Sequence, residues 1–219
     1  MNIFELFAQS WPRLVDGLGV TLSTTLISLA IATVLGLLFG LMLVSPNKVF
    51  RGIAHVYVDL IRGTPIIVQA FFIYFGVPNA TGIRLTAVMA GIITLSLNAG
   101  AYSAEIVRGG IQSVPKGQME AARSLGLTRG MAMRKVILPQ AVRIMVPSLV
   151  NQCIITLKDS SILSVIGLTE LTQTGRLIIA NNFESFKMWI IVGIMYFIPI
   201  MILTKLSQWV ERKLKIAKN

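Results

Sequence analysis

Residues 17–47 read GLGVTLSTTLISLAIATVLGLLFGLMLVSPN, a run of 31 residues without a single charged side chain. An α-helix rises about 1.5 Å per residue and therefore needs about 20 mostly apolar residues to cross about 30 Å of hydrocarbon. The run exceeds this minimum, and it predicts a helix that spans a membrane.

Four further uncharged runs follow along the chain. They are Gly63–Ile83, Leu85–Ala104, Ile144–Leu157 and Met188–Thr204, which are 21, 20, 14 and 17 residues long. The last reaches spanning length when Phe186 and Leu206 extend it. The Ile144–Leu157 run does so only if its helix carries Lys158 and Asp159 into the membrane and continues through residues 160–168. We therefore predict an all-α polytopic membrane protein of about five spans.

The composition excludes several other classes of protein. Hydrophobic residues make up 54% of the 219 residues and charged residues 13%, about half the charged share of an ordinary soluble domain. Apolar content this high also excludes a disordered chain. Cys153 and His55 are the only cysteine and histidine, which excludes a disulfide framework and a metal site built from these residue types. We treat residues 1–219 as a single transmembrane domain.

Lysine and arginine are divided unequally between the predicted connectors. With five spans, 14 of the 20 fall on the side of the first connector, the third connector and the carboxyl-terminal tail, and four fall on the other side. Connectors rich in these residues stay in the cytoplasm. We expect the carboxyl terminus in the cytoplasm and the amino terminus outside, with residues 1–16 forming an uncleaved amphipathic segment on the membrane surface. The basic charge then needs no nucleic acid to explain it.

The third connector, Gly109–Pro147, carries the most specific pattern. We predict a short helix over Lys116–Leu125 that ends at Gly126, because glycine suits the left-handed backbone just after a helix. Thr128 can cap a second helix, and Pro139 would prepare the start of the fourth span.

Small side chains mark the first of these helices, where Ala121 and Ala122 follow Glu120. Small residues allow another backbone to approach closely. The positive-inside bias accounts for the charge of the connector but not for this ordered helix–glycine–helix. The pattern therefore predicts a surface that docks in the groove of a partner protein.

The spacing of this connector resembles a known motif. Glu120-Ala121-Ala122 is followed after three residues by Gly126, and after nine more by Val136-Ile137-Leu138-Pro139. This pattern resembles the EAA motif of ABC importer permeases, which usually has isoleucine where Val136 stands. The resemblance implies that six residues couple the chain to an ATPase: Glu120, Ala121, Ala122, Gly126, Leu138 and Pro139.

Three further blocks resemble the polar amino acid branch of that family, in order across nearly the whole chain. They are Arg62-Gly63-Thr64-Pro65 with Gln69, Asn98-Ala99-Gly100-Ala101-Tyr102 with Glu105 and Arg108, and Lys158-Asp159-Ser160-Ser161 followed by Gly167, Glu170 and Leu171. The resemblance implies a type I ABC importer permease fold in the inner membrane of a bacterial cell. It also implies a second permease chain, two ATP-binding cassette ATPase subunits and an extracytoplasmic substrate-binding protein.

The chain contains no pattern typical of catalysis. It has no GxxxxGK[ST] phosphate loop, so it cannot hold nucleotide phosphates by that route. Neither paired carboxylates nor a serine–histidine arrangement points to an enzyme. We expect no metal and no cofactor of its own, with ATP bound by the partner ATPase.

Polar side chains at membrane depth are the candidates for a substrate pathway, because they are costly to bury in a bilayer. They are Gln69, Asn98, Asp159, Ser160 and Ser161. The amides could equally hydrogen-bond between helices, and the serines could bond to their own helix backbone. Asp159 could receive a cationic substrate group or form an internal ion pair.

We interpret most of the other charged residues as structural. Asp59 and Arg62 are three residues apart, as are Glu105 and Arg108, so each pair can meet on one helix face. Glu170 falls at the external mouth, where we expect a solvated carboxylate. Lys158 is given a structural or gating role.

These observations together predict the permease subunit of an ATP-driven importer of polar amino acids. The acidic Asp159 favours a basic substrate such as arginine, lysine or histidine, while glutamine stays open, as does the choice between homodimer and heterodimer. An ion-coupled secondary transporter is the main alternative, but the chain is short and shows no internal repeat. A non-transporting scaffold is the second alternative, but it need not retain Asn98, Lys158 and Asp159 in the membrane.

Overall fold

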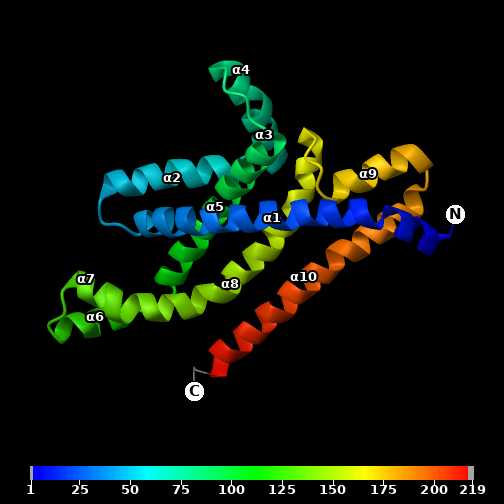
Figure 1. Ribbon diagram of the computed structural model, residues 1–219. Coiled ribbons are helices and arrows are strands. Elements are labelled where there is room, and N and C mark those ends of the chain that lie inside the picture. The colour runs from blue at the N-terminus through cyan, green and yellow to red at the C-terminus, as the bar shows by residue number, and fades with distance from the viewer. Residues whose placement is uncertain (1, 217–219) are drawn as a thin grey trace.

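The computed structural model describes residues 2–216, with side chains through residue 213, and all the regular structure in that part of the chain is helical. Four helical segments are long and apolar enough to cross a membrane, and a bent pair of segments makes a fifth. Figure 1 shows two long helices, α1 (Ile3–Leu43) and α10 (Ser185–Ile216), which lie close together near the amino terminus and diverge from there. The predicted all-α class and the number of spans are confirmed.

Helix α1 is longer than the predicted first span. Its start is a capping box in which the Asn2 backbone N–H donates to Glu5 Oε2 at 3.0 Å. The expected surface segment is not separate, because residues 3–16 continue the same helix through Pro12.

The second span is broken at Gly63-Thr64-Pro65. Helix α2 (Lys48–Arg62) ends there, and the segment formed by α3 (Ile66–Phe71), the π-helical turn η1 (Phe72–Gly76) and α4 (Val77–Thr81) leaves it at an angle of 101°. Proline has no amide hydrogen and disfavours helix before it, which accounts for the break. Helix α4 ends at Gly82, which has φ +77°.

The remaining spans agree with the predicted runs. Helix α5 (Ala87–Gln112) forms the third span. The fourth runs without interruption over residues 129–166, through α7 (Arg129–Ala132), η2 (Met133–Ile137), α8 (Leu138–Asp159) and the 3₁₀ segment η3 (Ser160–Ile166). It therefore carries Lys158 and Asp159 as its length requires. Pro139 lies inside this continuous helix instead of preparing its start.

The connector between α5 and the fourth span also has the predicted form. Helix α6 (Lys116–Ser124) is followed by Gly126 with φ +83°, and the Thr128 side chain caps α7 by accepting from the Met131 N–H. At the other end of the structure from α6, helix α9 (Leu171–Asn182) occupies the connector before α10 (Figure 1).

The central crossing is between α1 and α5. A Cβ placed on Gly36 would come within 2.5 Å of Ser103 Cβ, and one on Gly40 within 2.6 Å of Val107 Cβ. These glycines are four residues apart on one face of α1 and allow the two backbones to approach closely.

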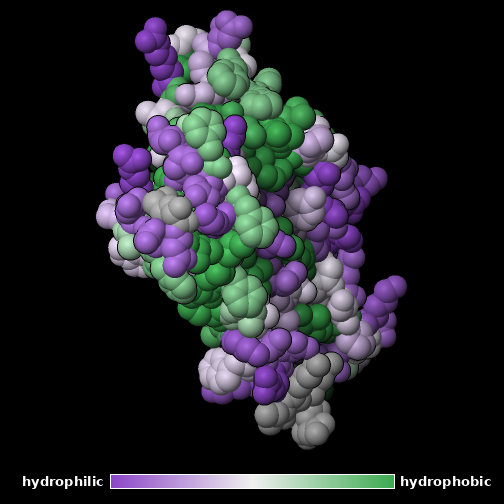
Figure 2. Space-filling view, turned by 90° about the vertical axis from the view of Figure 1, so that its right-hand side faces the viewer, coloured by the Kyte–Doolittle hydropathy of each residue, from purple (hydrophilic) through white to green (hydrophobic). Residues whose placement is uncertain are grey.

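Large apolar side chains face outward from the spans. Figure 2 shows an extensive hydrophobic patch in the middle of the view, with hydrophilic side chains gathered at its margins. Leu26, Val34 and Leu38 of α1 are each more than half exposed. A soluble protein rarely shows so much apolar surface, whereas lipid contact requires it.

Candidate functional site

A polar cavity of about 600 Å³ lies where the break between α2 and α3 meets α5 and α8. The side chains that line it and can make polar contacts are Arg62, Thr64, Asn98, Tyr102, Gln152 and Asp159. Asn98 and Gln152 are buried, with 7% and 5% of their surface exposed. Buried polar groups at membrane depth are costly unless they have a partner or a ligand.

The cavity brings together two of the five residues predicted for a substrate pathway, Asn98 and Asp159. The two serines bond to their own helix: Ser160 Oγ donates to the Leu157 carbonyl at 2.7 Å, and Ser161 Oγ to the Lys158 carbonyl at 2.7 Å. Neither serine lines the cavity.

Gln69 lies behind the cavity wall. Its Nε2 donates to the carbonyl oxygens of Ile61 at 2.7 Å and Thr64 at 3.0 Å, and its Oε1 accepts from Asn98 Nδ2 at 3.1 Å. The side chain therefore links the helix break to the cavity residue Asn98.

Four polar residues of the cavity are not among the residues predicted for a substrate pathway: Arg62, Thr64, Tyr102 and Gln152. Gln152 lies two helical turns before Asp159, and Tyr102 lies one turn after Asn98, so each shares a helix face with a predicted residue. That spacing is the signal that could have identified Gln152 and Tyr102.

Asp159 has no ion-pair partner in the described part of the chain, and neither has Lys158. The side chain of Asp159 is partly exposed toward the cavity, whereas Lys158 is exposed and does not line it. The two neighbours point to different surroundings because successive residues on a helix diverge by about 100°.

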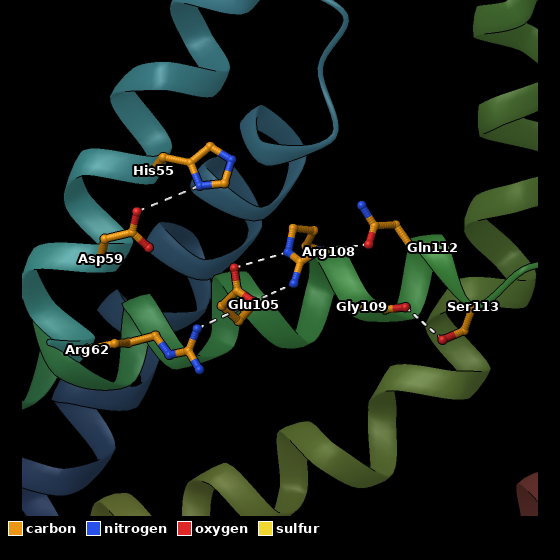
Figure 3. A network of polar contacts seen from close by, with 8 residues as sticks. All are labelled: His55, Asp59, Arg62, Glu105, Arg108, Gly109, Gln112 and Ser113. Carbon is orange, nitrogen blue, oxygen red and sulfur yellow. Dashed lines mark hydrogen bonds and ion pairs between the residues drawn. The ribbon is translucent and has the colours of Figure 1, made fainter.

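Arg62 pairs across helices and not along its own. Figure 3 shows Arg62 of α2 reaching Glu105 of α5, with Nη1 and Oε2 3.4 Å apart. The predicted pair between Asp59 and Arg62 is wrong, since Asp59 lies 3.9 Å from His55 instead. The Asp59 side chain is 74% exposed and Glu105 only 20%, so the charge of Glu105 is less screened by solvent and attracts Arg62 more strongly.

The Glu105–Arg108 pair is present. Arg108 donates to Glu105 from Nη2 at 2.7 Å and from Nε at 3.1 Å, and its Nη1 donates to Gln112. The Arg62 guanidinium also lies 5.2 Å from the centre of the Tyr102 ring. Arg62, which lines the cavity, is therefore joined to a network of charges on α5.

A second surface is formed by the connector helix α6. Glu120 and Ala121 are exposed, while Ala122 is buried beneath them. The Gly126 N–H donates to the Arg123 carbonyl and the Leu127 N–H to the Ala122 carbonyl, so the left-handed turn closes the helix. Leu125, an apolar residue at the tip, is 84% exposed.

The remaining two residues of the predicted motif lie at the start of α8. Leu138 is partly buried and packs against the cluster that contains Val107, Ile111 and Ala141, whereas Pro139 is exposed. The motif therefore has one exposed part on α6 and one part that joins the fourth span.

Glu170 is buried and not solvated, which corrects the prediction. Its carboxylate accepts from the backbone N–H groups of Thr172 at 2.9 Å and Gln173 at 2.7 Å, and from Tyr196 OH. It is the N-cap of α9 and is fully enclosed. Burial raises the pKa of this carboxyl, and the hydrogen bonds from Tyr196 and the two amides oppose that rise.

Comparison with known proteins gives consistent matches over nearly the whole chain. The family described as binding-protein-dependent transport system inner membrane component matches residues 32–216. The glutamine transport system permease protein GlnP of Escherichia coli K12 is 42% identical over 206 residues, 94% of each chain. The arginine transport system permease protein ArtQ of Bacillus subtilis is 37% identical, covering 98% of this chain and 99% of that one.

Solved structures match as well. A chain in the crystal structure of an amino acid ABC transporter with histidines superimposes with a TM-score of 0.92 at 39% identity, covering 97% of this chain and 99% of that one. A chain of the inward-facing MetNI methionine ABC transporter has a TM-score of 0.78 at 23% identity, over 92% and 96% of the two chains, and is similar in fold.

Proposed function

Because this chain belongs to the family of binding-protein-dependent transport system inner membrane components, we propose that it is the permease subunit of an ABC importer of polar amino acids. It is a multi-pass protein of the inner membrane. It is not an enzyme, since ATP hydrolysis belongs to a separate ATPase subunit, and a substrate-binding protein is its other partner.

The substrate pathway passes through the cavity between the α2–α3 break, α5 and α8. The observation that carries this assignment is the carboxylate of Asp159, which lines the cavity from within a span and has no ion-pair partner among the side chains of residues 2–213. An unpaired acidic group at this depth is costly without a ligand. Asn98 and Gln152 add polar groups, and Arg62 at the same cavity can attract the carboxylate of an amino acid.

A basic amino acid is the substrate that this cavity favours. The carboxylate of Asp159 can receive an ammonium or guanidinium group in a charge-assisted hydrogen bond. Relatives named for arginine and for glutamine are both similar to this chain, so these names do not separate the two substrates. The negative charge of Asp159 is the reason to propose arginine over glutamine as the substrate.

Transport is driven through the connector that contains α6. The exposed Glu120, Ala121 and Gly126 dock on the ATPase, which binds the ATP, and Leu125 offers an exposed apolar contact, while the buried Ala122 supports this surface from beneath. From Arg129 to Asp159 the chain is continuously helical, a length of about 45 Å at about 1.5 Å per residue. Movement at the docking surface, transmitted through Leu138 and Pro139, can therefore reach the cavity along one rigid element.

The full importer contains two permease chains, two ATPase subunits and the extracytoplasmic binding protein. The second permease is either a copy of this chain or a homologous one. Residues 1–219 act as one domain, with the amino terminus outside and the carboxyl terminus in the cytoplasm, which the 14 to 4 division of lysine and arginine supports.

The test is the variant Asp159→Asn, which keeps the shape of the side chain and removes its charge. Loss of a charge-assisted hydrogen bond costs roughly 1.5–3 kcal/mol, about ten- to a hundredfold in affinity. We expect the purified importer to lose arginine affinity by this factor and glutamine affinity much less. Equilibrium binding of each labelled amino acid to the permease–ATPase complex measures both.

Asp59→Asn is the matched control, because it removes an exposed carboxylate outside the cavity. It should leave both affinities unchanged. If Asp159→Asn weakens arginine and glutamine equally, or lowers the amount of folded complex, Asp159 is a structural residue and the assignment fails.

A further inference from the structure

The side chain of Gln69 compensates for the helix break. In an unbroken helix the Ile61 carbonyl would accept from the N–H of residue 65, but Pro65 has none. Gln69 Nε2 takes that place with its 2.7 Å bond to the Ile61 carbonyl, and it also donates to the Thr64 carbonyl at 3.0 Å. The Ile61 carbonyl also accepts a longer bond of 3.5 Å from the Thr64 hydroxyl, so the Gln69 amide supplies the shorter bond at Ile61 and the bond at Thr64.

These bonds leave one orientation for the Gln69 amide. Turning it over would place its oxygen against the carbonyl oxygens of Ile61 and Thr64, which can only accept. The Thr64 hydroxyl does not change this, because it donates to the Leu60 carbonyl at 2.9 Å and accepts from Nε2 at 3.0 Å. Gln69 Oε1 must therefore face Asn98.

The fixed orientation of the Gln69 amide also determines the orientation of the Asn98 amide. Facing an oxygen, the Asn98 amide has to present its amino group, and Nδ2 donates to Gln69 Oε1 at 3.1 Å. Asn98 lines the cavity, and its oxygen, Oδ1, accepts no hydrogen bond from the described residues. In this orientation Oδ1 is an acceptor open to a ligand in the cavity, beside the second N–H of Nδ2.

We infer that Gln69 is a positioning residue: it fixes the Asn98 amide so that Oδ1 receives the α-ammonium group of an amino acid in the cavity. An ammonium carries three donors and no acceptor, so it can use only this orientation. The inference rests on the proposed role of the cavity as the substrate site. It adds that Gln69, which does not touch the substrate, determines how the site recognises the amino group.

The experiment measures recognition of the α-ammonium group directly. Binding of L-arginine and L-glutamine to the purified permease–ATPase complex is compared with binding of 5-guanidinopentanoate and glutaramate, which lack only the α-amino group. Gln69→Met keeps the size of the side chain but removes both ends of its amide. We expect the preference for the amino acid over its deaminated analogue to fall by about tenfold or more, because the Asn98 amide is then free to turn.

A second variant tests the orientation itself. Both oxygens of a carboxylate accept, so adding Asn98→Asp to Gln69→Met should restore the preference whichever way the group turns. Thr94→Val is the control for loss of a buried polar group on α5, the helix that carries Asn98. The Thr94 hydroxyl bonds only to the Ala90 carbonyl, and Thr94 does not line the cavity. It should leave the preference unchanged.

The outcomes separate this inference from the proposed function. If Asn98→Leu reduces the preference but Gln69→Met does not, or if the double variant discriminates no better than Gln69→Met, the positioning role is overturned while the cavity stands. If Asn98→Leu and Asp159→Asn both leave amino acid binding intact, the cavity is not the substrate site and both proposals fail.

If Gln69→Met does not assemble, thermal unfolding of two Asn98 variants tests the positioning role instead. The inference then expects Asn98→Asp to unfold at a lower temperature than Asn98→Leu, because its carboxylate would face Gln69 Oε1. The reverse order overturns it.

Discussion

At the scale of the residue, the Glu170 carboxyl has a purely structural role. It starts α9 by accepting from two backbone amides and holds α10 through Tyr196. Thr21 of α1 contributes to the same junction, since its hydroxyl accepts from the Leu171 N–H at 3.1 Å. The buried carboxyl therefore joins three helices near the predicted external side.

We predict that Glu170 makes stability depend on pH. Its pKa in the folded protein is raised by burial above the ordinary value of 4.5. The folded state then keeps a proton that the unfolded chain has lost, so stability is full below pH 4.5 and falls as pH rises from there through the raised pKa. Thermal unfolding of the complex at a series of pH values should show this fall, and Glu170→Gln should remove it.

Glu120→Gln is the control for this measurement, because the Glu120 side chain is exposed on α6. It should show the same pH dependence as the native protein. A native slope that persists in Glu170→Gln would mean that another group is responsible.

At the scale of the element, the crossing of α1 and α5 depends on the absence of side chains. We predict that Gly40→Ala destabilises the protein, because the new Cβ would lie 2.6 Å from Val107 Cβ and 2.9 Å from the Ala104 carbonyl oxygen. In an uncrowded helix the same change stabilises by about 0.5–1 kcal/mol.

Gly193→Ala supplies the comparison, since nothing lies within 4 Å of a Cβ at Gly193 of α10. We expect its unfolding temperature to be equal to or above that of the native protein, and that of Gly40→Ala to be clearly below. Equal unfolding temperatures for the two variants would show that α1 and α5 are not held at this distance.

The connector helix α6 gives a second prediction at this scale. Gly126 has φ +83°, a conformation that costs about 1–2 kcal/mol for a residue with a Cβ atom. Gly126→Val should therefore distort the end of α6 and reduce substrate-stimulated ATP hydrolysis or release the ATPase, while the amount of permease in the membrane stays the same.

Gly130→Val is the matched control, because Gly130 lies on α7 without positive φ and with open space around it. It should retain coupling better than Gly126→Val. Normal assembly and full ATPase stimulation in Gly126→Val would contradict a docking role for this turn.

At the scale of the whole molecule, the unequal division of lysine and arginine predicts the orientation in the membrane. We predict that a cysteine at Lys116 is labelled by an impermeant reagent only from the cytoplasmic side, and a cysteine at Asn79 only from outside. The native Cys153 is replaced by serine in both variants so that each contains one thiol. Labelling of both positions from the same side would refute the arrangement with five spans.

Much of the fold could be predicted because it depends on local properties of the chain. Runs of apolar residues set which segments cross the membrane, since each must satisfy its backbone hydrogen bonds internally. Pro65 breaks the second span and Gly126 ends α6 because their effects on the backbone need no distant contact. The candidate site was predicted in part, since Asn98 and Asp159 are polar residues within such runs.

The meeting of side chains from different helices was decided by the tertiary structure alone. Gln69 and Asn98 are 29 residues apart, and Arg62 selects Glu105 over the nearer Asp59. The spacing of residues along the sequence does not determine these partners, because they depend on where the helices cross and on the direction of each side chain. Packing against α1 and α10 likewise buries Glu170, which lies in a connector that the sequence places at the surface. The sequence therefore determined the spans and their breaks, while the crossing geometry decided which polar groups share the cavity and which are sealed in the protein.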